Sequence, residues 1–134
     1  MISACLALQA ALVAHFRADA AIVALVGAPA ILDGVGPRAP DPHVLVDMPT
    51  RRDRSGGGAP LVEHVVQITV AAREPAFARV GAIEQALLDR LAVAPTLVGH
   101  RLVLLDLDHA EFRRDADRRG ARARLTLRAL TEPL

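Results

Sequence analysis

The chain has 134 residues, a hydrophobic fraction of 52% and a formal net charge of +1 at pH 7. This length fits one domain, the hydrophobic fraction excludes a disordered chain, and the small net charge does not argue for a nucleic-acid footprint over the whole surface. Because only 2% of the residues are aromatic, with no Trp or Tyr, the core must be built mainly from aliphatic side chains and alanine.

The N-terminal part of the chain is predicted to form two helices. Ser3 is a candidate N-cap, and Asp19 is a candidate cap for a second, short helix that Gly27 ends. The stretch lacks the basic residues that begin a signal peptide, and the apolar run 20–32 is too short to span a membrane. We therefore expect a soluble protein made in the cytoplasm. Apolar residues recur at helical spacing in the first helix: Cys5, Leu8, Leu12 and Phe16.

The middle of the chain carries strand patterns. Short strands are expected at 30–32 and 43–48, and the clearest alternation of apolar and other residues runs over 61–73. Between them, residues 50–59 read "TRRDRSGGGA" and are predicted to form a flexible loop, because three glycines are costly to order. A strand rather than a helix follows these glycines, so the loop does not fit a phosphate-binding loop.

The last part of the chain predicts a helix and a hairpin. The helix is expected over 74–93, with Pro75 in its first turn, and two strands at 100–114 and 121–130 flank the turn-rich "DADRRG". The predicted fold is α+β, with one domain over residues 1–134. Two N-terminal helices and one central helix pack on a mostly antiparallel or mixed sheet of about four to five strands.

No catalytic, cofactor-binding or metal-binding set is predicted. The five histidines do not have metal-ligand spacing, and Cys5 has no basic neighbour in the sequence to activate it. The segment "DLDHAE" lacks the pattern of a calcium loop. On a regular strand Asp106 and Asp108 would share one face, and His109 and Glu111 the opposite face. The sequence thus favours a protein that is not an enzyme.

Two sets of charged residues are candidate contacts with a neighbouring subunit or another partner. In the last strand, arginines share one face, while the opposite face is apolar and is expected in the core. The alternatives for this face are a solvated surface, a subunit contact or a nucleic-acid surface. The first set lies in the loop and consists of Arg51, Arg52, Asp53 and Arg54. The second set lies in the last strand and consists of Arg122, Arg124 and Arg128.

The order of several short motifs resembles the tail-completion, or tail-terminator, family of long-tailed (siphovirus-type) phages and gene transfer agents, formerly a domain of unknown function. The first half carries "LQAAL", "ADAAIVALVG", "ILDGV" and "PDPHVLVDM". The second half carries "HVVQITVAARE", "LVGHRLVLLDLDHAEFRRDAD" and "ARARLTLRALTEPL". Together these motifs cover nearly the whole chain.

The resemblance implies a structural virion protein that forms a homo-hexameric ring at the head-proximal end of the tail tube. Such a tail terminator stops tube polymerisation and takes part in head–tail joining. The implied partners are the major tail tube protein and the head–tail connector (stopper) protein, with DNA passing through the ring lumen without sequence-specific binding, and no membrane. The implied location is the virion or phage-like particle, with assembly in the bacterial cytoplasm.

Two other functional classes stay open at this point. One is another head–tail connector subunit, such as the stopper or an adaptor ring. The other is a small enzyme or ligand-binding domain whose site the sequence does not reveal.

Overall fold

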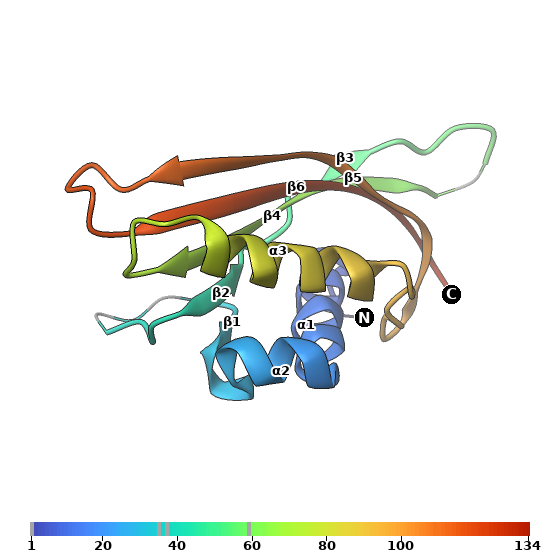
Figure 1. The fold of residues 1–134 in the computed structure, drawn as a ribbon. Helices are drawn as coiled ribbons and strands as arrows, with labels where there is room; N and C mark the ends of the chain where they lie inside the picture. The colour runs from blue at the N-terminus through green and yellow to red at the C-terminus, as the bar shows by residue number, and fades with distance from the viewer. Residues whose placement is uncertain (1, 35, 37, 59) are drawn as a thin grey trace.

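The helices lie on one face of a six-stranded sheet, whose opposite face they leave uncovered (Figure 1). The computed structural model describes residues 2–34, 36, 38–58 and 60–134. The helices are α1 (Ala4–Arg17), α2 (Ala20–Val26) and α3 (Ala78–Leu91), with a 3-10 turn after α2 at Ala28–Ala30. The strands are β1 (Ile31–Leu32), β2 (His43–Val46), β3 (Arg52–Asp53), β4 (Val62–Ala72), β5 (His100–Arg114) and β6 (Ala121–Pro133).

The sheet is mixed but mostly antiparallel. Its strand order is β1-β2-β4-β6-β5, and β3 pairs with β4 beside this path. Only the β1–β2 pair is parallel among the described strand pairs. The predicted α+β class is confirmed, and the strand count exceeds the predicted four to five because β3, only two residues long, forms within the predicted loop.

The core lies between the helices and the covered face of the sheet. Leu8, Leu12 and Phe16 of α1 are fully buried, as the helical spacing predicts. Strand β6 contributes alternate residues to this core, all buried: Ala121, Ala123, Leu125, Leu127 and Ala129. The small alanines allow the helices to approach the sheet closely, which suits a chain with so few aromatic residues.

The helix ends follow the sequence signals only in part. The Ile22 amide donates a hydrogen bond to Asp19 Oδ1 at 3.1 Å, and Gly27 ends α2 with a φ of +81°. Ser3 occupies the N-cap position of α1, but its side chain makes no capping hydrogen bond. Helix α3 begins at Ala78, so the placement of Pro75 in its first turn is wrong. The chain needs residues 73–77 to turn back from β4 before the helix can lie on the sheet.

No single helix among the described residues is long and apolar enough to cross a membrane. Helices α1 and α2 meet the test only when taken together, as a pair bent by 84°.

Candidate partner-binding surface

The uncovered face of the sheet, here called the outer face, is polar and carries the predicted arginines of the last strand. Arg122, Arg124 and Arg128 are exposed on it, as the alternation of β6 predicts. Thr126 lies between them in the strand and is buried. None of the described helices packs on this face (Figure 1). Its side chains are therefore available to a partner.

Strand β5 contains a bulge that changes which acidic residues face outward. Its pairing with β6 shifts between Leu107 and His109, so Asp108 is an extra residue on the bulged strand. Asp106, His109 and Glu111 consequently share the outer face. The prediction that Asp106 and Asp108 share one face, and His109 and Glu111 the opposite face, is therefore wrong, because the bulge reverses the alternation of side chains beyond it. These three residues lie opposite outer-face residues of β6: Arg128, Thr126 and Arg124, respectively.

Glu63 joins the predicted loop set to the predicted strand set. Its Oε2 accepts a hydrogen bond from Arg128 Nε at 2.7 Å, and its Oε1 accepts one from Arg54 at 3.1 Å. The hydrogen bond from Arg128, and then that from Arg54, holds the pKa of Glu63 below its ordinary value. Arg54 and Arg128 are thus both engaged with a carboxylate of their own chain.

The other two arginines of the last strand belong to a different group, the basic end of the outer face. This group is defined by the arginines that line three connected pockets where β4 ends and the β5–β6 hairpin turns: Arg73, Arg113, Arg119, Arg122 and Arg124. Among the described residues, no carboxylate lies within ion-pair distance of the Arg73 or Arg124 guanidinium.

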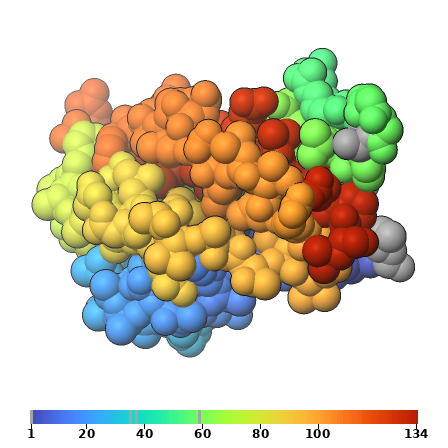
Figure 2. Space-filling view, turned by 90° about the vertical axis from the view of Figure 1, so that its right-hand side faces the viewer, coloured from blue at the N-terminus to red at the C-terminus, as the bar shows by residue number. Residues whose placement is uncertain are grey.

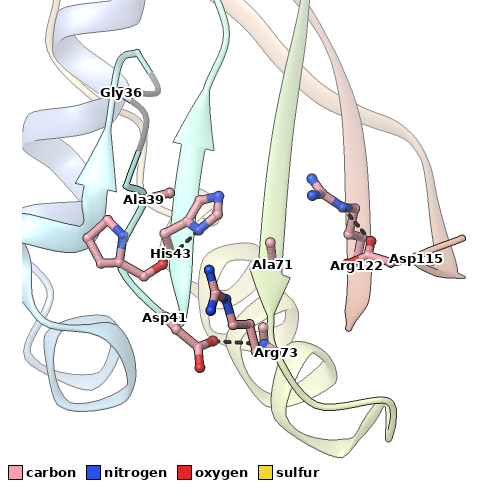
Figure 3. Close-up of a pocket in the computed structure, with 10 residues that line it drawn as sticks. Gly36, Ala39, Asp41, His43, Ala71, Arg73, Asp115 and Arg122 are labelled. Carbon is pink, nitrogen blue, oxygen red and sulfur yellow. Dashed lines mark hydrogen bonds and ion pairs between the residues drawn. The ribbon is translucent and has the colours of Figure 1, made fainter. Parts of the chain in front are cut away.

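The first pocket of the basic end has a volume of about 330 Å³ (Figure 3). His43 of β2, Arg73 after β4 and Arg122 of β6 surround it, and the Arg73 side chain points toward His43. Arg122 Nε donates to Asp115 Oδ1 at 2.7 Å, which fixes one side of the pocket. The Arg73 backbone amide donates to Asp41 Oδ1 at 2.8 Å. The Arg73 guanidinium itself remains available for an anion.

The other two pockets extend this surface. One, of about 70 Å³, is lined by Thr69, Glu111, Arg113, Arg122 and Arg124. The other, of about 420 Å³, is lined by Arg73, Asp115, Asp117, Arg119 and Gly120. Since Arg122 belongs to the first and second pockets, and Arg73 to the first and third, the basic surface is continuous.

Sequence reasoning missed three members of the basic end: Arg73, Arg113 and Arg119. For Arg113 and Arg119 the signal is the segment 113–124, "RRDADRRGARAR", where six arginines accompany two aspartates. Arg73 lies outside this segment, and only the fold brings it there.

The predicted loop over residues 50–59 forms a short hairpin that projects from the body of the molecule (Figures 1 and 2). Its strand β3 pairs with β4, and the Arg54 amide donates to the Leu61 carbonyl at 2.8 Å. Hydrogen bonds from Ser55 hold the pKa of Asp53 below its ordinary value. Arg51 and Arg52 are exposed on this arm, and Ala59 lies outside the described residues. Among the described residues of the arm, Arg54 alone connects it to an arginine of β6, through the Glu63 carboxylate shared with Arg128.

One pair of side chains raises the question of catalysis. Cys5 Sγ lies 3.7 Å from His64 Nδ1, a pairing that the sequence did not reveal. His64 Nδ1 also lies 2.8 Å from the Thr50 carbonyl oxygen, which can only accept, so Nδ1 carries the proton and cannot take one from the thiol. Nε2 then accepts from the Thr131 hydroxyl at 2.8 Å. Burial lowers the pKa of His64 and keeps the ring neutral.

His64 is therefore a hydrogen-bonded core histidine. It joins the start of the arm to the last strand and does not act as a base for Cys5. Among the residues that the structure describes, no group of three or more His, Cys, Asp or Glu side chains could hold a metal ion.

An open polar sheet face and a projecting arm offer two surfaces through which the domain can contact other proteins. The chain matches the family described as "Tail completion protein gp17" over residues 10–132. It belongs to this family, and its class is that of structural phage-tail proteins.

Solved structures agree with this family. The chain is similar to one from a structure titled "Virion of native gene transfer agent (GTA) particle", with 32% sequence identity and a TM-score of 0.86. The match covers 98% of this chain and 99% of that chain. A search of curated proteins gave no match.

Proposed function

We propose that this protein is a tail terminator. In this proposal it forms a homo-hexameric ring at the head-proximal end of the tail tube, ends tube polymerisation and joins the tail to the head connector. The observation that supports it most is the nearly full-length match, in both directions, to a chain of a gene transfer agent virion. Membership of the tail completion family supports the same role. The protein acts by binding its neighbours, without enzymatic activity or a cofactor.

A closed ring needs two different surfaces on each subunit, which meet head to tail. One candidate surface is the arm with Arg51, Arg52, Asp53 and Arg54. The other is β5, which forms an edge of the described sheet and exposes large apolar side chains. An exposed apolar edge strand is unfavourable in an isolated subunit and is covered in a stable assembly. The exposed apolar residues of β5 are Val103, Leu107 and Phe112.

The other proposed contacts lie above and below the ring. The major tail tube protein would meet one rim and the head–tail connector protein the other, with particle DNA passing through the lumen. The protein would be found in the virion or phage-like particle, after assembly in the bacterial cytoplasm.

We expect the arm to become ordered when the ring forms. The turn 55–58 contains three successive glycines and is exposed, so contact with a neighbour must overcome roughly 1–2 kcal/mol of backbone entropy per residue. Hydrogen exchange should show fast exchange of the turn amides in the isolated subunit and slow exchange in particles. The Thr50 amide, which donates to the Val65 carbonyl at 3.0 Å, is the internal control and should be protected in both. Strong protection of the turn in the isolated subunit would contradict this expectation.

Deletion of the gene in the parent particle system is expected to leave tails that are overlong or lack heads. Without a terminator nothing stops addition of tube subunits, and the tail has no surface that the connector recognises. Electron microscopy would give the distribution of tail lengths, and the gene supplied on a plasmid should restore it. Tails of normal length on filled, infectious particles would rule out the terminator role. Correct tail lengths with the subunit located on the head portal would instead indicate a stopper or adaptor ring.

A further inference from the structure

We propose that the basic end of the outer face binds the sugar–phosphate backbone of double-stranded DNA without reading its sequence. The proposal adds a binding surface to the proposed function, and it rests on charges and geometry that each isolated subunit carries. It can therefore be tested separately from ring formation and from tail length.

The first supporting observation is a strong separation of charge within the chain. Residues 113–124 contain six arginines and two aspartates, while the remaining residues contain ten arginines and thirteen carboxylates. The formal net charge of +1 therefore conceals a positive hairpin on an otherwise negative molecule. Such a distribution orients a polyanion toward one end of the protein and raises its rate of association.

The second observation is the arrangement of the arginines. Arg122 and Arg124 are alternate residues of one strand, so their Cα atoms are roughly 7 Å apart on the same face. Arg113 of β5 lies directly opposite Arg122 of β6. Arg73 and Arg122 both line the first pocket. Each strand of a duplex carries one negative charge per roughly 3.4 Å of helix axis, so a row of guanidinium groups can contact several phosphates at once.

The pockets beside these arginines add depth to the surface. Two of them, of about 330 and 420 Å³, leave room for phosphate oxygens next to Arg73. Because no carboxylate within the described residues pairs with Arg73 or Arg124, these guanidinium groups can offer paired N–H donors to a phosphate. Arg113 and Arg122 already contact Glu111 at 3.5 Å and Asp115 at 2.7 Å, which positions both of them.

The composition of the basic end favours DNA over an acidic protein. Protein interfaces usually bury aromatic or large aliphatic anchors at their centre, and no such side chain is found among the described residues that line these three pockets. The described large apolar residues that are exposed lie outside these pockets. Phe112 lies on the opposite face of β5, where the centroid of its ring is 5.8 Å from that of Phe77.

The same composition favours duplex over single-stranded DNA. Single-strand binding uses aromatic platforms on which bases stack. The chain has no Trp or Tyr and three phenylalanines, and none of the three lines the basic end. Contact limited to the backbone also gives no means of reading base edges.

The test compares two charge reversals in the full-length protein. Arg124→Glu changes an arginine of the basic end that has no partner among the described residues. Arg101→Glu changes an exposed arginine at the other end of β5, paired with Glu132, and alters the net charge by the same amount. A labelled duplex of about 20 base pairs is titrated with each protein at about 50 mM salt, and fluorescence anisotropy reports binding. Circular dichroism confirms that each variant is folded.

We expect Arg124→Glu to weaken DNA binding by about tenfold or more, and to reduce the slope of log affinity against log salt concentration by about one. Arg101→Glu should stay within about twofold of the unmodified protein, because local contacts rather than net charge decide backbone binding. Two duplexes of unrelated sequence should bind equally.

Three results would overturn the proposal. The first is an equal loss in both variants, which would indicate a general charge effect. The second is the absence of duplex binding by the folded, unmodified protein at low salt. The third is tighter binding to a polyglutamate peptide or to anionic phospholipid vesicles than to duplex DNA, which would assign the surface to a protein or a membrane.

Discussion

Replacement of Phe16 by Ala is expected to lower the free energy of unfolding by about 3–5 kcal/mol. Phe16 is fully buried and is the largest side chain among the fully buried residues. Its loss removes transfer free energy and leaves a cavity between α1 and the sheet, which aliphatic neighbours of fixed length cannot fill. Domains of this size have a free energy of unfolding of only about 5–15 kcal/mol. The substitution therefore removes a large part of the stability of the fold.

Urea unfolding followed by circular dichroism measures this loss. Phe112→Ala is the matched control, since Phe112 is 41% exposed and contributes mainly its edge-to-face contact with Phe77. The control should lose less: about 0.5–1.5 kcal/mol for the edge-to-face contact, in addition to a loss of buried area that is smaller than for Phe16. Equal losses for the two variants would mean that the core is not centred where α1 meets the sheet.

Replacement of Gly120 by Ala is expected to destabilise the protein by about 1–3 kcal/mol, because it overpacks a closed turn. A Cβ atom at this position would lie 2.9 Å from the Ala72 carbonyl oxygen and would also collide with the Asp115 carboxylate. Arg122 holds the Asp115 carboxylate by a hydrogen bond, and the Ala72 carbonyl belongs to the backbone. Displacement of either group therefore costs free energy. The β5–β6 hairpin must then shift away from the end of β4.

Gly34→Ala is the control for this prediction. A Cβ atom there has no neighbour within 4 Å, and Gly34 is not among the glycines of positive φ. The control should change stability by less than about 1 kcal/mol, in the stabilising direction, through the unfolded chain. If Gly120→Ala is as stable as the control, then the close packing of the hairpin against β4 is not maintained in solution.

Local patterns in the sequence were sufficient for most of the fold. The alternation in 61–73 and 121–130 predicts which residues of β4 and β6 enter the core, because adjacent side chains of a strand must point to opposite faces. The same rule places Arg122, Arg124 and Arg128 together on the outer face. Asp19 and Gly27 mark the ends of α2, since capping depends on neighbouring residues only. The order of the family motifs indicates the family that the comparison confirms.

Tertiary structure alone decided how these pieces combine into a surface. The bulge at Asp108 depends on the register of β5 against β6, so local alternation assigned Asp106 and His109 to opposite faces when they share one. Arg73 and Arg122 border one pocket because β4 and β6 are neighbours in the sheet.

The same holds for side-chain pairs between elements that are far apart in the sequence. Glu63 meets Arg128 across 65 positions of sequence, and Cys5 meets His64 across 59. Such contacts arise only when the chain closes long loops, whose outcome depends on the packing of the whole core and not on the spacing of residues. For this protein the sequence by itself determined which residues are buried and which segments are rich in arginine. The folded sheet decided which of those arginines have no carboxylate partner among the described residues and face the same partner molecule.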